Sequence, residues 1–128
     1  MDNNIYRDIF VAFVRVHILH HAAEAPVFGL EMIDELQHHG YSLSPGTLYP
    51  IFHALEAAGY LTSTSKVVAG KTRKYYKATA RGKKILAELK DKIRELVAEV
   101  LSIDVAATTG AQKTRKPNAP RAARTATS

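Results

Sequence analysis

The chain has 128 residues, the size of one ordinary domain, and 46% of them are hydrophobic, which is enough for a folded core. It contains no cysteine, so disulfides, thiolate zinc sites and cysteine nucleophiles are excluded. The longest apolar run near the start, residues 9–14, is too short to span a bilayer, and no signal-peptide pattern precedes it. We therefore expect a soluble cytoplasmic protein with no membrane partner.

The net charge of +6 is distributed unevenly along the chain. Residues 16–65 contain no Lys or Arg, whereas residues 66–84 contain eight of them and no Asp or Glu. A block of one charge sign creates a local positive field, and its usual partner is a polyanion such as nucleic acid. The alternative is a solvated segment whose lysines serve solubility alone.

The first predicted helix covers residues 3–23 and is apolar around nearly its whole circumference. Its apolar side chains are Ile5, Ile9, Phe10, Phe13, Val14, Val16, Ile18 and Leu19. A helix of this kind must be buried on more than one side. Because the core of so small a domain can cover only one side, we expect a second subunit to cover the other.

A second helix is predicted for residues 27–39, directly after Pro26. Its apolar face has a spacing of three residues and consists of Leu30, Ile33 and Leu36. Its opposite face is acidic and consists of Glu31, Asp34 and Glu35. Gly40 is expected to end the helix in a left-handed conformation.

A third helix is predicted from Ser44, a good N-cap, to about Ala58. Pro45 suits its first position, where a missing N–H costs nothing. Its expected buried stripe consists of Leu48, Phe52 and Leu55. Pro50 should either kink the helix or mark a tightened first turn, in which case the regular helix starts nearer Thr47.

Two strands, residues 60–66 and 72–78, are predicted to form a basic hairpin with its turn at Gly70. Thr79 is expected to cap a last helix that runs to about Ile103. The apolar residues of that helix recur at intervals of three and four and form a heptad seam: Leu86, Leu89, Ile93, Leu96, Val100 and Ile103. The seam favours a partner helix over packing within one domain. Residues 104–128 have the composition of a disordered basic tail.

The resulting fold class is mostly α with a small β-hairpin, in the order of a winged helix-turn-helix. In such folds the second helix of the motif enters the major groove of DNA. The candidate DNA-binding residues of the third helix are Ser44, Pro45, Gly46, Thr47, Tyr49 and His53. Those of the hairpin are Lys71, Arg73, Lys74 and Lys77, which can bind phosphates.

The motif from Ser44 to Pro50 resembles the PadR family of bacterial transcriptional regulators when it is combined with the downstream pattern. That pattern comprises His53, Leu55, Glu56, Gly59, Leu61, Arg73, Lys74, Tyr75, Tyr76, Thr79 and Gly82. Ile18, Leu19, Gly29 and Leu36 match upstream, and the resemblance covers about residues 5–103. It departs at Ala54, where many relatives carry Arg or Lys, and in having no Trp for a drug pocket at the dimer centre.

The resemblance implies a homodimer through the first and last helices, usually a repressor, and the short C-terminal subgroup. The expected interface residues are Phe10, Phe13, Leu86, Leu89, Ile93, Leu96 and Val100. We expect residues 1–79 to form the DNA-binding domain, residues 80–103 the dimerisation helix and residues 104–128 the tail. The expected partners are a double-stranded DNA operator, a second copy of the chain and a small-molecule effector that releases the repressor.

Two other functions stay open, a winged-helix module that binds proteins and a metal-responsive regulator. The second would use His17, His20, His21 and Glu24 on the first helix, while His38 and His39 end the second helix. We expect ordinary surface histidines, and no metal or cofactor is assigned. No phosphate-binding glycine loop, nucleophile elbow or HExxH motif is present, so no enzyme is expected.

Overall fold

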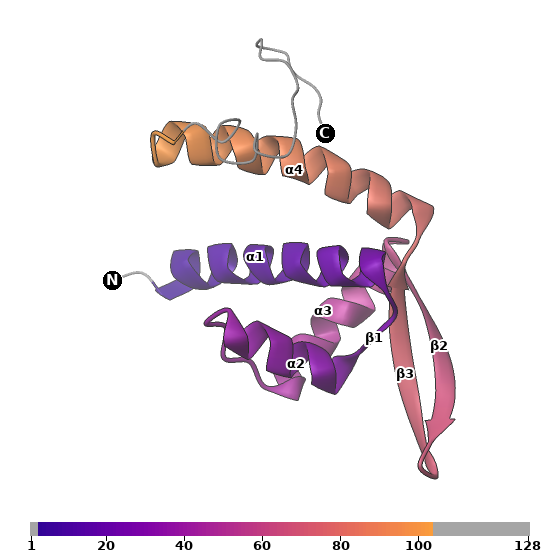
Figure 1. Cartoon of the computed structure of the whole chain (residues 1–128). Coiled ribbons are helices and arrows are strands. Elements are labelled where there is room, and N and C mark those ends of the chain that lie inside the picture. The colour runs from indigo at the N-terminus through magenta and orange to yellow at the C-terminus, as the bar shows by residue number, and fades with distance from the viewer. Residues whose placement is uncertain (1–2, 104–128) are drawn as a thin grey trace. The chain divides into compact units, whose positions relative to one another are not determined.

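The computed structural model describes residues 3–103 as four helices and three strands (Figure 1). The helices are α1 (Asn3–Glu24), α2 (Gly29–His38), α3 (Pro45–Ala57) and α4 (Ala80–Val100). The strands are β1 (Val27–Phe28), β2 (Leu61–Val68) and β3 (Lys71–Ala78). The chain divides into two compact units, one ending at Lys84 and one beginning at Ile85, so the first turn of α4 belongs to the first unit. Between residues 3 and 103, no helix combines the length and hydrophobicity that crossing a membrane requires.

The strands form one antiparallel sheet in the order β1-β3-β2. In β1, Val27 pairs with Tyr76 and Phe28 pairs with Tyr75. The prediction of a helix from Val27 was therefore wrong, because these two residues are extended and α2 begins at Gly29. A strand of two residues is stabilised by its partner strand and carries no periodicity of its own.

The hairpin of β2 and β3 is longer than predicted and pairs in register from Leu61 with Ala78 to Val68 with Lys71. Its turn consists of Ala69 and Gly70, whose φ angles are 52° and 79°. Two consecutive residues of positive φ give the mirror-image turn whose twist matches that of the strands. Gly70 was predicted at this turn, and Ala69 shares it. We call residues 61–78 the wing.

The core of the first unit lies between α1, α2, α3 and the base of the wing. Its fully buried side chains include Val14, Ile18, Met32, Leu36, Leu48, Phe52 and Tyr76. The rings of Phe52 and Tyr76 stack with centroids 4.4 Å apart and tie α3 to β3. The predicted stripe of α3 is confirmed, whereas the apolar face predicted for α2 is only partly buried. Leu30 is 52% exposed, and Met32 is buried instead.

Helix α3 continues through Pro50, and of the two outcomes predicted for this proline the tightened first turn is found, although the helix starts at Pro45 and not nearer Thr47. Its first turn is tightened, because the Ser44 carbonyl accepts hydrogen bonds from the N–H groups of both Thr47 and Leu48, each at 3.0 Å. Ser44 occupies the N-cap position, but its hydroxyl donates to Thr47 Oγ1 at 3.3 Å rather than capping the backbone. Gly40 follows α2 with φ 88°, as predicted.

The junction of wing and α4 is held by Thr79 and Gly82. Thr79 Oγ1 donates to the Gly59 carbonyl at 2.7 Å and accepts from the Gly82 N–H at 3.0 Å, which confirms the predicted cap. A Cβ at Gly82 would collide with the carbonyl oxygen of Tyr60. Helix α4 ends at Val100, three residues before the predicted end at 103. The predicted tail, 104–128, lies outside the described residues.

Candidate nucleic-acid interface

The first turn of α3 presents an uncharged, accessible surface. Ser44, Pro45 and Gly46 are exposed, Thr47 is half-buried, and no acidic residue occurs in this turn. The N-terminus of a helix carries a partial positive charge that favours an anion. At Gly46 an added Cβ would meet only Ser44 Oγ, at 3.7 Å, so the backbone is open on this side. This turn can therefore approach a sugar-phosphate backbone closely.

Two arginines of α1 lie beside this turn and were not predicted as site residues. Arg7 and Arg15 line a surface hollow of about 470 Å³ together with Gly46 and Thr47. The remaining lining residues are Asp8, Val11, Pro50 and Ile51. The sequence shows that residues 7, 11 and 15 share one face of a helix, but it does not show what that face lies against. Only the packing of α1 against α3 places that face at the first turn.

Tyr49 and His53 differ in how far they can reach from α3. His53 is exposed, whereas Tyr49 is half-buried and lies against Gly29 of α2. A Cβ at Gly29 would come within 2.6 Å of the Tyr49 hydroxyl oxygen and 2.8 Å of Cζ. Tyr49 therefore also helps to pack α2 on α3, and its contact with DNA stays a prediction.

The register of the wing separates its cations onto two faces. Side chains alternate along a strand. Lys71, Arg73 and Lys77 therefore share one face of β3 with Tyr75, and Lys74 lies on the opposite face with Tyr76. Lys66 of β2 pairs directly with Arg73 and joins the first group. We call the face formed by Lys66, Lys71, Arg73 and Lys77 the cationic face.

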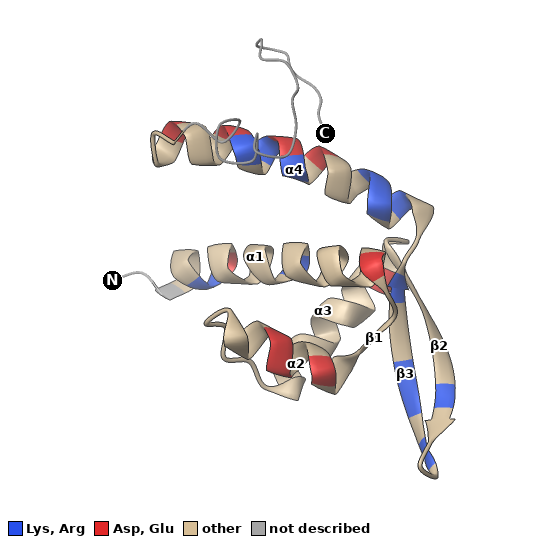
Figure 2. Cartoon of the chain, viewed as in Figure 1, with Lys and Arg blue, Asp and Glu red and all other residues tan. Residues whose placement is uncertain are grey.

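Aromatic rings support the cations of this face. The Arg73 guanidinium lies 4.7 Å from the centroid of the Phe28 ring, and Lys66 Nζ lies 5.2 Å from that of Tyr75. These contacts are favourable and limit the rotamers of both side chains. Two like charges directly opposite each other on paired strands are unfavourable, and a bound anion would relieve that repulsion. Figure 2 shows the blue cations along the wing and the red carboxylates on α2.

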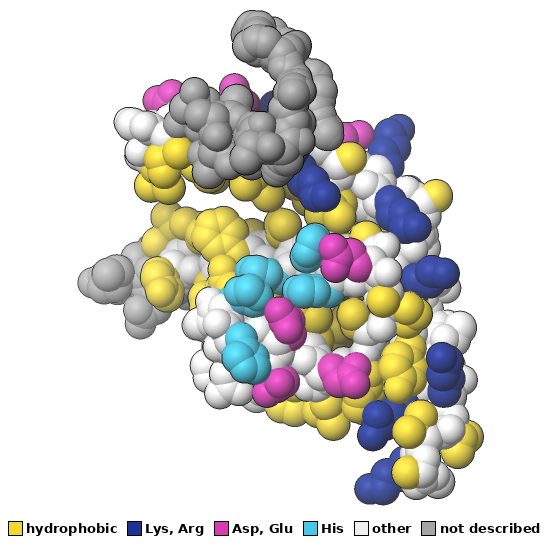
Figure 3. Space-filling view, viewed as in Figure 1, with side chains coloured by type: hydrophobic (Ala, Val, Ile, Leu, Met, Phe, Trp, Pro, Cys, Tyr) yellow, Lys and Arg dark blue, Asp and Glu magenta, His cyan; other side chains and the backbone are white. Residues whose placement is uncertain are grey.

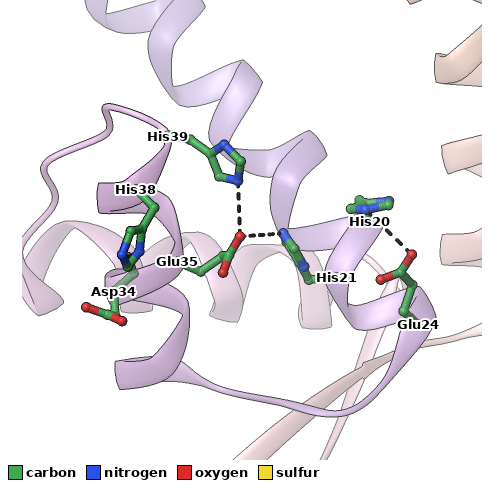
Figure 4. Close-up of polar contacts among 7 residues, drawn as sticks. All are labelled: His20, His21, Glu24, Asp34, Glu35, His38 and His39. Atoms are coloured by element: carbon green, nitrogen blue, oxygen red, sulfur yellow. Dashed lines mark hydrogen bonds and ion pairs between the residues drawn. The ribbon is translucent and has the colours of Figure 1, made fainter.

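Histidines gather over α1 and α2, beside carboxylates (Figure 3). His39 Nε2 lies 3.0 Å from Glu35 Oε2, and His21 Nε2 lies 3.6 Å from the same oxygen (Figure 4). The sequence grouped His17, His20 and His21 with Glu24. The structure brings His20, His21 and Glu24 together, with His20 3.6 Å from Glu24, and it forms a second group of His17, His21 and His39.

Among the histidines of α1 and α2, His17 has an altered pKa. Burial lowers its pKa below the ordinary value of 6.5, and the neighbouring His39, His21 and His20 lower it further, while Glu35 opposes the shift. Desolvation and nearby positive charge both disfavour the imidazolium. The neutral imidazole of His17 is therefore favoured near neutral pH.

Apolar side chains are exposed on both helices of the predicted dimer interface. On α1, Phe13 is 47% exposed, and the rings of Phe10 and Tyr41 meet edge to face at 4.7 Å. On α4, Ile93, Leu96 and Val100 are exposed, whereas Leu86 is buried. Large apolar side chains exposed in a row are typical of an interaction surface.

A helix-turn-helix of α2 and α3 followed by a basic wing defines a winged-helix DNA-binding regulator. A profile of the transcriptional regulator PadR-like family matches residues 18–88. The chain therefore belongs to the PadR-like family of transcriptional regulators, which confirms the resemblance inferred from the sequence. As a member of this family it is a DNA-binding transcriptional regulator.

Among curated proteins, the chain is 50% identical over 95 residues to the transcriptional regulator Rv3488 of Mycobacterium tuberculosis, covering 74% of this chain and 89% of the relative. A solved PadR family regulator from Eggerthella lenta is 27% identical, with a TM-score of 0.67 over 78% of this chain and 88% of the other. A transcriptional regulator from Clostridium thermocellum is 28% identical, with a TM-score of 0.63 over 74% of this chain and 95% of the other.

Proposed function

We propose that the protein is a homodimeric transcriptional repressor that binds a palindromic double-stranded DNA operator. The observation that carries this proposal is the cationic face of the wing, where four cations stand on one side of two strands and two of them rest on aromatic rings. No acidic residue occurs between residues 66 and 84 to offset them. A phosphate backbone is the polyanion that such a face fits.

The first turn of α3 and the wing divide the work of binding. The turn is uncharged and open, so it sets the register of the protein on the DNA and contacts base edges in the major groove. Thr47 and Ser44 carry hydroxyls there, and Arg7 and Arg15 stand beside them for phosphate contacts. The wing lies beside the groove and supplies most of the electrostatic attraction to the phosphates. The acidic residues of α2 are kept away from the DNA.

Dimerisation is assigned to the exposed apolar rows of α1 and α4. Two copies related by a two-fold axis present two α3 helices to two half-sites about one helical turn apart. An effector that favours one spacing of the two helices over another changes the affinity for the operator. We infer repression, so deletion of the gene should raise transcription from the promoter that the protein binds.

A salt titration separates DNA binding from a winged-helix module that binds proteins. Binding to a fluorescein-labelled duplex of random sequence is measured by anisotropy at increasing KCl. A regulator that contacts about six to ten phosphates should show a decrease of about a thousandfold or more in affinity between about 50 and 200 mM salt. An absence of binding at the lowest salt would overturn the proposal.

A further inference from the structure

Two histidines of α1 and His39, the residue after α2, bring their ring nitrogens together where α1 passes the C-terminal end of α2. The metal-binding atoms of His17, His21 and His39 all lie within 4.8 Å of one another. Glu35, one turn before His39 on α2, points its carboxylate at the same place (Figure 4). The cluster lies entirely within the first compact unit.

The two distances from Glu35 to its histidines are close to those between the ligands of a metal ion. Four ligands placed about 2.0–2.2 Å from zinc at the corners of a tetrahedron lie about 3.3–3.6 Å from one another. Glu35 Oε2 is 3.0 Å from His39 Nε2 and 3.6 Å from His21 Nε2, which brackets that range. The three imidazoles lie within 4.8 Å of one another, so their side chains would have to rotate inward to surround an ion.

Ordinary ion pairs explain only part of the arrangement. Glu35 accounts for the positions of His21 and His39, each of which approaches its carboxylate. It does not account for His17, whose ring stacks on that of His39 at 4.8 Å and meets the ring of Tyr41 at 5.2 Å. A cation shared by the three ring nitrogens would account for the position of His17 as well.

We propose that His17, His21, His39 and Glu35 form a binding site for one first-row divalent transition-metal ion, with zinc as the best fit. Three imidazoles and one carboxylate are ligands that zinc accepts in tetrahedral sites. Imidazole-rich sites also suit nickel and copper, whereas magnesium and calcium require oxygen ligands. The bound ion would link α1 to the C-terminal end of α2, the first helix of the helix-turn-helix.

A second group of three, His20, His21 and Glu24, is less suited to the same ion. All three residues lie on the last turns of α1, and the side chains of His20 and Glu24 are 44% and 66% exposed. One helix then supplies every ligand, and His21 can serve only one of the two groups. The site of His17, His21, His39 and Glu35 joins two segments of the chain and is more strongly preorganised. Substitution of His20 therefore serves as a matched control.

Zinc binding to the full chain, after removal of metal with EDTA and buffer exchange, tests the proposal by isothermal titration calorimetry. We expect one zinc per chain in the wild type. The affinity should be at least about tenfold lower in H39A and E35Q, because even the loss of a hydrogen-bond partner of a metal ligand costs about that much. H20A should keep wild-type affinity, and so should H38A, whose Nδ1 donates instead to the Asp34 carbonyl at 2.9 Å. Magnesium should not compete with zinc.

Cobalt substitution supplies a second measurement that does not depend on any variant. Cobalt in the wild type should give the intense visible absorption of a four-coordinate ion, and added zinc should remove it. Far-UV circular dichroism of each apo variant checks that it is folded. No stoichiometric zinc uptake, an equal affinity in H39A and wild type, or a weaker affinity in H20A alongside an unchanged affinity in H39A would each overturn the proposal.

Discussion

Single glycines show how closely the backbone of this fold is packed. Gly82 lies in the first turn of α4, where its N–H bonds to Thr79 Oγ1 and its Cα faces the carbonyl of Tyr60. Gly46 lies in the first turn of α3, where the backbone is open. The missing side chain therefore serves the fold at Gly82, whereas at Gly46 we assign it to DNA binding.

Replacing Gly82 with alanine should lower the free energy of unfolding by about 1–3 kcal/mol, because overpacking forces the backbone to shift. Urea unfolding followed by circular dichroism measures the change. Gly46→Ala is the matched control, since its Cβ meets only Ser44 Oγ at 3.7 Å. A Gly82→Ala protein as stable as the wild type would show that the junction of wing and α4 is looser than described.

Gly46→Ala itself should separate stability from function. Alanine in a helix is favoured over glycine by about 0.5–1 kcal/mol, so the variant should unfold at a slightly higher temperature. Its affinity for duplex DNA should nevertheless fall, since the added methyl group stands between the first turn of α3 and the sugar-phosphate backbone. Thermal unfolding and fluorescence anisotropy measure the two effects. Unchanged or tighter DNA binding would remove this turn from the proposed interface.

At the scale of elements, the wing is a two-stranded ribbon whose alternation sorts its cations by face. Lys66, Arg73 and Tyr75 are held together on one face by strand pairing and by cation–aromatic contacts. A preorganised set of cations gives up less side-chain entropy when it binds phosphate than flexible lysines do. The wing is therefore suited to strong binding that does not depend on sequence.

Arg73→Ala should weaken binding to duplexes of all sequences by a similar factor and reduce the salt slope by about one, because the variant neutralises one phosphate fewer. Anisotropy titrations at several KCl concentrations measure both quantities. Lys92→Ala removes one exposed cation of α4 outside the wing and serves as the charge-matched control. An equal effect of the two substitutions would mean that net charge, and not the wing, governs the affinity.

Features set by local chemistry could be predicted from the sequence, whereas features set by packing could not. The Thr79 cap, the glycine after α2 and the buried stripe of α3 depend on neighbours in sequence. Strand β1 depends on Tyr75 and Tyr76, far along the chain, and has no local signal. The position of the α1 arginines beside α3, and the contact of His21 with Glu35, likewise require the tertiary structure.

At the scale of the whole molecule, the proposed function needs two copies of the chain. Large apolar side chains are exposed along α1 and along the seam of α4, which is typical of interaction surfaces. A single winged helix contacts too few bases and phosphates to select an operator tightly, and a dimer doubles the contacts.

Leu89→Asp should convert the dimer into monomers, because it places a charge in the middle of the predicted seam. Light scattering after size-exclusion chromatography measures the mass. Lys90→Asp introduces the same side chain at the next, exposed position and should leave the dimer intact. A Leu89→Asp protein that stays dimeric would refute the proposed interface.

The most direct test of the central claim is selection of binding sites by the purified protein from a pool of randomised duplexes. A dimer that reads DNA with two α3 helices should enrich a palindrome whose half-sites are separated by about one helical turn, roughly 10 base pairs. Enrichment of no sequence, or of a single unrepeated half-site, would contradict the account.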